Sequence, residues 1–596
     1  MKSKCVKIAI LDTGVNCHHP LIQNIKGNDK IIGFSLKITN NTITTESNFH
    51  DSLGHGTAIY YLIKKNICTS NVSIYNIKIF DDEISIKQND FLTIMEYIIK
   101  TYDFNIINIS FGFKYCHYYT RMEKIFSEYK KKNIEIICAF NNNGALSYPA
   151  ALGTTIGVSV DDNVKNKNNF IFYKNSIVNI SGSNSIYKVP WIDNKYNIVK
   201  GSSYLTAIIC SRFANNLMLH NNYLFDFEQQ NCNKFIEDEE IGYLGNVAVF
   251  PFSKEEHPIA CYEELINASN IDYYTTRKQG MVGKKISTVL PFSNNNKTIK
   301  CIENININNY DTIIIGHTKM LNIIEGRNYD EFILNKINSK VKIICFDTSL
   351  NIHNNNLKYI SLSCLNINSL VDTRNKLFIT HKPIICIAGT SSIQGKFTIQ
   401  LELRKRLLNA NYNVGQLGTE PSSKIFGFDS SFPCGYETKI PFSISKTIQY
   451  INQQIWKITQ KNVDLIICGT QSGLAPVCNN NIYNYPIIHQ IFYEVINPDV
   501  TILCVNIFDS LNLIKKCINI AESLANSKVI ALVCYPKKNK NNWEGNLGKQ
   551  IPLSYEEYNN FKIKIYQELK VPVYLLSDAN DLNILTNNIL NYFSKK

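Results

Sequence analysis

Short apolar runs alternate with amphipathic stretches along the first 225 residues. Runs rich in Val and Ile predict buried strands at 6–11, 72–80, 106–112 and 134–140. Between them, "DFLTIMEYIIKTY" and "RMEKIFSEYKKK" repeat their apolar positions every three or four residues, which predicts helices. Strands that alternate with helices are typical of a parallel sheet covered by helices. Residues 1–225 are therefore predicted to form one α/β domain.

The same alternation returns twice beyond a polar, acidic segment at 226–240, which is interpreted as a linker. The runs "LGNVAVFPF", "YDTIIIGHT", "VKIICFDT" and "LKYISLSCL" predict a Rossmann-like α/β domain over 241–378. The runs "PIICIAG", "VDLIICG", "VTILCVNIF", "KVIALVCYP" and "VPVYLLS", closed by the helix "DLNILTNNILNYF", predict another α/β domain over 379–596. The chain is thus predicted to hold three α/β domains in a row.

Composition places the chain among soluble globular proteins, with 44% hydrophobic and 19% charged residues. No apolar run approaches the roughly 20 residues of a membrane helix. The apolar part of "MKSKCVKIAILDTGV" has only about six residues, so it is interpreted as a strand and not as a signal peptide. The 18 cysteines are scattered without a CxxC pair, which indicates reduced thiols in a cytoplasmic protein. No metal site is expected, because Cys17, His18 and His19 are not matched by a second group of metal ligands elsewhere in the sequence.

A formal net charge of +13 raises the question of a nucleic-acid partner. The lysines are dispersed along a chain rich in Lys, Asn and Ile, and they form no basic surface interleaved with aromatic residues. Neither a nucleic-acid nor a membrane partner is therefore predicted.

Three residues are suited to nucleophilic catalysis. Asp12 ends the first strand in "AILDTGV", and His55 lies between two glycines before a helix. Ser203 lies at another helix start, in "GSSYLTAIIC", where it is either a nucleophile or a simple helix N-cap. A serine nucleophile needs a base, a carboxylate that orients the base, and donors for the oxyanion. The order Asp, His, Ser matches one known arrangement of such triads.

The blocks "ILDTGVNCHHPLI", "HGTAI", "INISFG" and "GSSYLTA" resemble those of the subtilase family of serine peptidases over residues 5 to 220. The resemblance implies a subtilisin-like fold in which Asp12 orients His55, His55 is the base and Ser203 is the nucleophile. It places Asn142, or a neighbouring Asn, at the oxyanion position, and residues 110–112 beside the substrate backbone. Proteolysis of this kind needs no cofactor.

This chain departs from the subtilase pattern at two points. Tyr204 and Leu205 are bulky where the family has small residues, so a different pocket is expected. The Asp block also begins within the first dozen residues, which leads us to expect a cytoplasmic enzyme without a propeptide.

A second candidate site lies in "IICIAGTSSIQGKFTIQLELRKRLL", a strand, a Gly- and Ser-containing loop and a helix. A helix start behind such a loop can hold phosphate. Five residues separate Gly389 from Gly395, one more than in the standard motif. The spacing resembles the variant loop of dethiobiotin-synthetase-like enzymes. That resemblance implies ATP and Mg²⁺, with Lys396 on the phosphates and Thr398 near the metal ion.

A phosphate-binding loop of this kind is expected to have a partner carboxylate after a later strand. The strand in "VDLIICGTQ" is followed by no such residue, so Glu420 and Asp429 are the candidates for that role. The alternative is a strand–turn–helix whose glycines only permit tight packing. The layout of 241–596 also resembles proteins of clostridial peptide-maturation systems.

Together these features predict an intracellular subtilisin-like serine endopeptidase that processes a ribosomally made precursor peptide. One alternative is an inactive protease fold that binds peptide for an ATP-dependent modifying module. The other is a general ATP-regulated intracellular protease.

Overall fold

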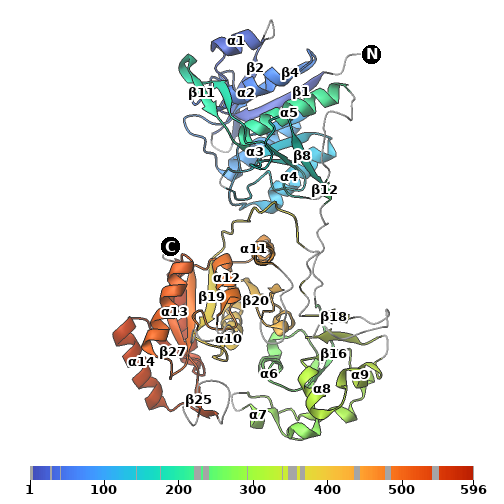
Figure 1. Ribbon diagram of the computed structural model, residues 1–596, viewed down its shortest axis with the longest axis vertical. Coiled ribbons are helices and arrows are strands. Elements are labelled where there is room, and N and C mark those ends of the chain that lie inside the picture. The colour runs from blue at the N-terminus through green and yellow to red at the C-terminus, as the bar shows by residue number, and fades with distance from the viewer. Residues whose placement is uncertain are drawn as a thin grey trace. The chain divides into compact units, whose positions relative to one another are not determined.

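The computed structural model describes residues 5–26, 30–39, 42–142, 144–174, 176–219, 230–231, 241–290, 293–337, 340–346, 359–362, 365, 370–434, 443–476, 485–539 and 550–594. The chain divides into two compact units (Figure 1). Unit 1 comprises residues 1–236 and 368–380, and unit 2 comprises residues 237–367 and 381–596. Both are α/β with parallel sheets, as the sequence predicts. Most of the predicted linker at 226–240 lies outside the described residues.

Unit 1 is built on a ten-stranded sheet of order β12-β8-β9-β7-β6-β5-β1-β4-β2-β3. All pairings are parallel except β2 with β3 and β8 with β9. The strands are β1 Val6–Asp12, β2 Ile32–Thr39, β3 Thr42–Glu46, β4 Val72–Lys78, β5 Ile106–Ile109, β6 Glu135–Ala139, β7 Ile156–Val160, β8 Phe170–Lys174, β9 Ile180–Gly182 and β12 Gln230–Asn231. The four strands predicted from apolar runs are β1, β4, β5 and β6.

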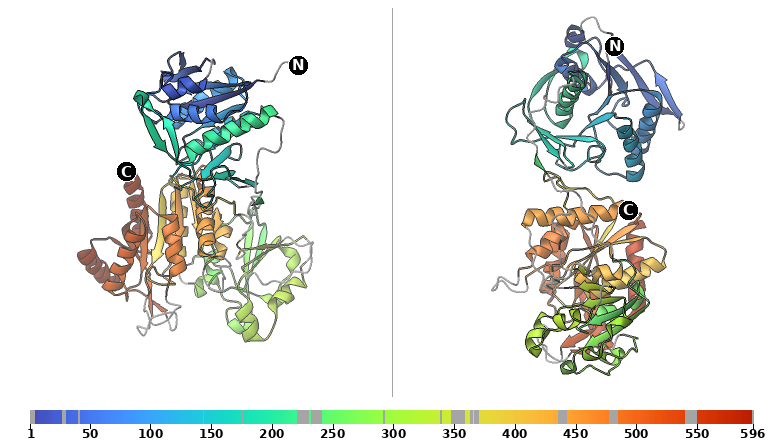
Figure 2. Two further views of the ribbon diagram at one scale, coloured as in Figure 1. Left: turned by 45° about the horizontal axis from the view of Figure 1, so that its top comes forward. Right: turned by 90° about the vertical axis from the view of Figure 1, so that its right-hand side faces the viewer.

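The helices of unit 1 cover the sheet (Figure 2). They are α1 Pro20–Lys26, α2 His55–Asn66, α3 Gln88–Thr101, α4 Tyr119–Lys131 and α5 Ser202–Leu219. One core packs apolar residues of α2 and α5 against alternate positions of the central strands, including Ile8, Ile106 and Ile137. The central strands are therefore buried by helices, which is why they read as apolar runs and not as alternating patterns.

A hairpin precedes α5. It is made of β10 Tyr187–Pro190 and β11 Tyr196–Val199, and a 3₁₀ turn at Ile192–Asn194 forms its tip. The hairpin places residues 200–203 at the start of α5, close to the carboxyl ends of the central strands.

Unit 2 contains two parallel sheets. The first has the order β15-β14-β13-β16-β17-β18. Its elements are β13 Asn246–Phe250, α6 His257–Cys261, β14 Asn270–Thr275, α7 Ile286–Val289, β15 Lys300–Cys301, β16 Thr312–Ile315, α8 Lys319–Glu325, α9 Tyr329–Leu334, β17 Lys342–Cys345 and β18 Tyr359–Ser361.

The second sheet has the order β21-β20-β22-β19-β23-β24-β27. Its strands are β19 Ile384–Gly389, β20 Val414–Gly418, β21 Ser430–Ser431, β22 Leu465–Gly469, β23 Val500–Val505, β24 Lys528–Cys534 and β27 Val573–Leu575, with a hairpin of β25 Lys537–Asn539 and β26 Gln550–Pro552 beside it. Its helices are α10 Lys396–Asn409, α11 Ile444–Gln460, α12 Ile487–Ile496, α13 Leu511–Leu524, α14 Tyr555–Leu569 and α15 Ala579–Ser594. Apolar side chains such as Leu401 and Phe426 join the core of the first sheet, so the two sheets of unit 2 pack as one body.

Residues 368–380 group with unit 1, whereas the sequence placed residues up to 378 with the domain that follows the linker. The grouping rests on main-chain hydrogen bonds that span about 200 residues of sequence, such as Ile177 N–H to the Asp372 carbonyl at 3.1 Å. Apolar periodicity describes neighbours along the chain, so it could not indicate this return.

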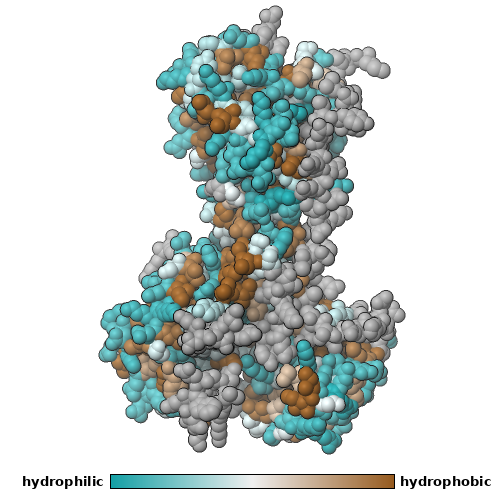
Figure 3. Space-filling model, in the orientation of Figure 1, coloured by the Kyte–Doolittle hydropathy of each residue, from teal (hydrophilic) through white to brown (hydrophobic). Residues whose placement is uncertain are grey.

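The surface drawn in Figure 3 is mixed, with hydrophilic residues between small groups of hydrophobic ones. Among the helices of the described ranges, none combines the length and apolar character needed to cross a bilayer.

Candidate functional site

The carboxylate of Asp12 and the imidazole of His55 form a hydrogen-bonded pair in unit 1. His55 Nδ1 lies 2.8 Å from Asp12 Oδ1 and 3.0 Å from Oδ2. The Asp12 side chain is 2% exposed and the His55 side chain 15%, so solvent screens the pair poorly. A carboxylate on Nδ1 fixes the tautomer in which Nε2 is the free base.

Two loops approach each other closely to make this pair. A Cβ on Gly56 would lie 2.3 Å from the Gly14 carbonyl oxygen, so only glycine fits there. The Gly56 N–H donates to Thr13 Oγ1 at 2.8 Å, which ties the two loops together. Asp12 at the end of β1 and His55 at the start of α2 therefore meet through backbone contact.

Asp51 anchors the start of α2 from the preceding loop. Its carboxylate is 1% exposed and accepts hydrogen bonds from the N–H groups of Leu53, Gly54 and Thr57 and from the Thr57 hydroxyl, all at 2.6 to 2.9 Å. A carboxylate at a helix N-terminus accepts hydrogen bonds from free N–H groups and interacts favourably with the positive end of the helix dipole. The sequence analysis overlooked Asp51, although an Asp shortly before a helix start is the signature of such a cap.

Ser203 is the second residue of α5, inside the helix. Its hydroxyl donates to the Ser110 carbonyl at 2.7 Å, just past the end of β5. The N-cap alternative for Ser203 is therefore not what the structure shows. The hydroxyl is directed to the carboxyl edge of the sheet, where Asp12 also ends its strand.

Asn142 contacts the start of α5 instead. Its Oδ1 accepts the Ser202 N–H at 2.9 Å, and a Cβ on Gly201 would lie 2.8 Å from its Nδ2. Gly201 has a φ of 122°, a conformation that glycine adopts readily. The amide of Asn142 thus lies beside the backbone of residues 201–202, with Nδ2 as its donor.

The Tyr204 ring lies beside the imidazole of His55. The Tyr204 and His55 rings have centroids 5.5 Å apart with an interplanar angle of 54°. Burial, and to a lesser extent the nearby Asp12 carboxylate, raises the pKa of Tyr204 to about 12, so the phenol stays neutral. Leu205 packs against Gly182 of β9. Both bulky residues belong to the core of unit 1, and Tyr204 also contacts the imidazole of His55.

Opposing influences act on the pKa of His55. Burial lowers it, but the Coulombic attraction and hydrogen bond of Asp12 outweigh burial, with a smaller contribution from Asp51. The net result is a pKa above the ordinary value of 6.5.

A polar hollow of about 440 Å³ lies beside this group of residues. It is lined by Asn16, His18, His50, Asp51, Ser52, Ile192, Asp193 and Asn194. The lining combines the loop after β1, the loop before α2 and the tip of the β10–β11 hairpin. The hollow lies next to the loop that leads into α2, but Asp12, His55, Ser203 and Asn142 are not among its lining residues.

The loop at 389–396 in unit 2 connects the end of β19 to the start of α10. Gly389 ends the strand, Gly395 has a φ of 78°, and Lys396 and Thr398 lie in the first turn of the helix. The Lys396 ammonium donates to the Ser391 carbonyl at 2.6 Å, across the loop. Gln394 Oε1 accepts the N–H groups of Thr390 and Ser391, each at 3.1 Å.

The lysine of this loop is buried near a carboxyl group. Burial lowers the pKa of Lys396 to about 8, although Cys504 and Glu420 act in the opposite direction. Burial and the neighbouring Glu255 raise the pKa of Glu420 to about 8. Asp429, the other substitute acid, is instead paired with Lys461 at 2.6 Å.

Asp509 is a carboxylate that the sequence analysis overlooked. It follows β23, a direct neighbour of β19 in the sheet. Its Oδ2 accepts from the Thr390 hydroxyl and from Gln394 Nε2, the latter at 3.2 Å. Asp509 is therefore the acid that contacts the loop. It follows β23, whereas the sequence analysis expected the acid after β22, on the other side of β19.

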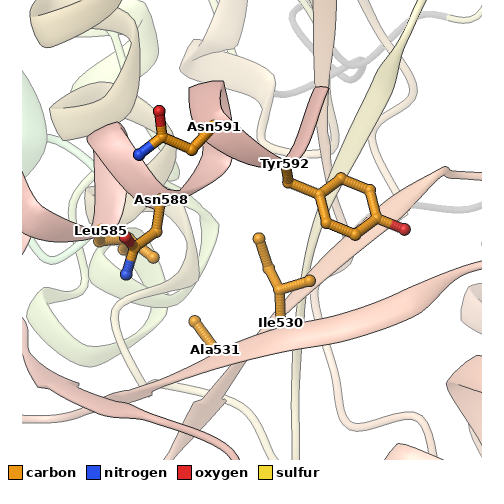
Figure 4. Close-up of a pocket in the computed structure, with 6 residues that line it drawn as sticks. All are labelled: Ile530, Ala531, Leu585, Asn588, Asn591 and Tyr592. Carbon is orange, nitrogen blue, oxygen red and sulfur yellow. The ribbon is translucent and has the colours of Figure 1, made fainter. Parts of the chain in front are cut away.

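A hollow of about 360 Å³ between β24 and α15 offers little chemistry. It is lined by Ile530, Ala531, Leu585, Asn588, Asn591 and Tyr592 (Figure 4). This lining has amide and phenol groups but no carboxylate, lysine or histidine, so the acid–base groups of unit 2 lie elsewhere.

Residues 3–238 match the family model described as Subtilase family, so the N-terminal part of the chain carries a domain of this family. A curated relative, the subtilisin-like protease SBT6.1 of Arabidopsis thaliana, is 32% identical over 167 residues, which are 26% of this chain and 15% of the relative. The chain thus matches only a small part of that protein's length.

Two solved structures align with portions of the chain at low identity. A cold-adapted subtilisin-like serine proteinase aligns with 36% of this chain and 76% of its own, at 18% identity and a TM-score of 0.28. A DUF1611 family protein from Anabaena variabilis aligns with 58% of this chain and 99% of its own, at 11% identity and a TM-score of 0.41.

The Asp12–His55 pair predicts a particular pH dependence. A general base must be neutral, so the reaction rate of Ser203 should rise with pH through the raised pKa of His55. In Asp12→Asn the carboxylate is lost while burial remains, so this limb should move to lower pH. The maximal rate should also fall by roughly 10⁴-fold, because the tautomer is no longer fixed.

The rate of Ser203 labelling by a fluorophosphonate, measured between pH 5 and about 9 around the ordinary His range, checks this prediction. An acid limb that stays in place in Asp12→Asn would contradict the role given to the carboxylate.

Proposed function

We propose that unit 1 is an active serine endopeptidase whose catalytic residues are Asp12, His55, Ser203 and Asn142. The observation that carries the proposal is the buried His55–Asp12 pair at the same sheet edge to which the Ser203 hydroxyl is directed. The subtilase match of residues 3–238 supports it.

The reaction begins when the Ser203 hydroxyl exchanges its hydrogen bond to the Ser110 carbonyl for one to His55 Nε2. Oγ then attacks the carbonyl carbon of the scissile peptide bond while its proton passes to Nε2. The imidazolium that forms is stabilised by Asp12. The same proton then passes to the leaving amine, and water hydrolyses the acyl-enzyme by the reverse sequence.

The proposed mechanism uses two donors for the oxyanion. One is the Ser203 N–H, in the first turn of α5, where N–H groups lack intrahelical partners. The other is Asn142 Nδ2, whose amide is oriented by the bond between Oδ1 and the Ser202 N–H. Preorganised donors of this kind stabilise the charge that develops in the transition state.

We further propose that the substrate is a ribosomally made precursor peptide and that the protein works in the cytoplasm. The union of a protease-type site with a separate α/β unit in one chain favours a dedicated substrate over general digestion. The fifteen described cysteines are free thiols, which suits a reducing compartment.

Substitution of Ser203 by Ala should abolish covalent labelling by a fluorophosphonate and cleavage of a candidate precursor peptide. Residual hydrolysis is expected to be lower by roughly 10⁶-fold, because attack then depends on unassisted water. Mass spectrometry of the labelled protein and of the peptide measures both results. Ser202→Ala is a matched control, because Ser202 is the adjacent residue and its hydroxyl accepts the Val160 N–H at 3.4 Å.

Other outcomes identify the alternatives. If wild type and Ser203→Ala are equally unlabelled while both bind the peptide, the domain is a binding scaffold. If wild type cleaves unrelated proteins as fast as the precursor, it is a general protease.

We propose, as a second function, that the loop 389–396 binds the phosphates of ATP with Mg²⁺. The observation that favours it is the buried Lys396 ammonium, which lies across the loop and donates to the Ser391 carbonyl. The carboxylate of Asp509 contacts the same loop at Thr390. Gln394 Oε1 occupies two loop N–H groups, so a phosphate would have to displace that side chain. Thr398, in the first turn of α10, would lie toward the metal ion.

Substitution of Lys396 by Ala should weaken ATP binding roughly ten- to hundredfold, because a charge-assisted contact to phosphate is lost. Isothermal titration of the full chain with Mg²⁺ and ATP measures the change. Lys405→Ala is the control on the same helix, since Lys405 is half-exposed and paired with Glu264. Equal affinity in wild type and Lys396→Ala would exclude this loop as the ATP site.

A further inference from the structure

Residues 371–378 form a strap on unit 1, although the chain on either side of residues 368–380 belongs to unit 2. The chain therefore leaves unit 2 after its first sheet, adds the strap to unit 1, and then builds the sheet that begins with β19. The strap also lies outside residues 3–238, the part matched by the subtilase model.

One end of the strap continues the hydrogen bonding of the sheet region near β8. The Asp372 carbonyl accepts the Ile177 N–H at 3.1 Å and the Ser176 hydroxyl at 2.9 Å. The Arg374 guanidinium lies 3.6 Å from the centre of the Tyr173 ring, and Tyr173 is 3% exposed. A cation held this close to the face of a buried ring is attracted by the ring quadrupole.

The other end of the strap contacts both ends of the loop that carries Asn142. The Leu377 carbonyl accepts the Leu146 N–H at 3.0 Å, four residues after Asn142. The Lys376 ammonium lies 5.7 Å from the centre of the Phe140 ring, two residues before Asn142. Leu146 and Phe140 are 1% and 2% exposed, so the strap holds buried anchors of this loop.

The loop transmits this support to the candidate active site. Within the loop, the Asn141 N–H donates to Ser147 Oγ at 3.0 Å, which fixes its width. Beyond it, Tyr148 pairs with Phe113 through N–H to carbonyl bonds of 2.7 and 2.9 Å. Asn142 then presents its amide to the start of α5. The strap thus supports the loop through Leu146 and Phe140, on either side of Asn142.

We propose that residues 371–378 are a positioning element of the candidate active site, which holds Asn142 where the oxyanion forms. Arg374 and Lys376 are its positioning residues, and the Leu377 carbonyl is its main-chain contact with the loop. The effect on catalysis rests on the proposed peptidase function, whereas the bracing of the loop does not. A small displacement of an oriented donor lowers a rate strongly, because the oxyanion bond depends on geometry.

The test uses the full chain with Arg374→Ala and Lys376→Ala combined. Amide hydrogen exchange in peptides that cover residues 140–148 should become about tenfold faster or more, because local opening becomes easier. The kcat for an activated ester should fall about tenfold with little change in KM. Arg212→Ala is the matched control, since it removes another cation–ring contact of unit 1, between Arg212 of α5 and Phe170 of β8 at 4.8 Å.

A double-mutant cycle separates positioning from a loss of folded protein. In an Asn142→Ala background the strap substitutions should cause no further fall in kcat, because the donor that they position is already gone. Additive effects would show that the strap acts elsewhere and overturn the proposal. Replacement of 371–378 by eight Gly and Ser residues is the stronger version of the same change, with thermal unfolding as the check on folding.

The outcomes also distinguish the two proposals. If wild type is as inactive as Ser203→Ala, the peptidase function fails, and exchange at 140–148 alone decides whether the strap braces the loop. If wild type is active and the strap variants match it in exchange or in kcat, the strap proposal is wrong.

Discussion

The pairing of Asp12 with His55 is the interaction on which the chemistry of unit 1 depends. A buried carboxylate is costly unless it is hydrogen-bonded, and Asp12 meets this cost through His55 Nδ1 and the Thr13 N–H. The pair forms only because β1 ends at a loop that can approach the start of α2 within backbone contact. Gly14 and Gly56 permit that approach, and Asp51 holds the start of α2 in the matching position. Four short sequence features thus combine to create one oriented imidazole.

Two further segments converge on the same edge of the sheet. The end of β5 supplies the Ser110 carbonyl that holds the Ser203 hydroxyl, and the loop after β6 supplies Asn142. Because β1, β5 and β6 are adjacent and parallel, their carboxyl ends lie side by side. This is the edge at which parallel sheets generally place ligand and catalytic groups. The start of α5, which carries Ser203, contacts this edge of the sheet and completes the group of candidate catalytic residues.

The sequence predicted those parts of the site whose determinants are local. Asp12 at a strand end, His55 before a helix and Ser203 at a helix start each follow from a few adjacent residues. The parts that it did not predict are long-range. The Ser110 contact of Ser203 spans 93 positions in sequence, and the Thr390 contact of Asp509 spans 119. Periodicity and local motifs carry no information on such pairs, because they depend on strand order. β14 and β20 were not identified as strands for a local reason, because their sequences contain fewer apolar residues in a row.

Residues 371–378 contact unit 1 although they lie far beyond residues 3–238, which match the subtilase model. Unit 1 has its own sheet, helices and core, yet the loop that carries Asn142 is held on one side by residues 230 positions or more away in sequence. A loop of this kind needs a partner for its main-chain groups, since an unpaired buried N–H such as that of Leu146 is costly. In this chain that partner is a segment that continues directly into β19 and the Lys396 loop. Only the short stretch from residue 379 to 383 separates this segment from β19, so the strap and the Lys396 loop are near each other along the chain.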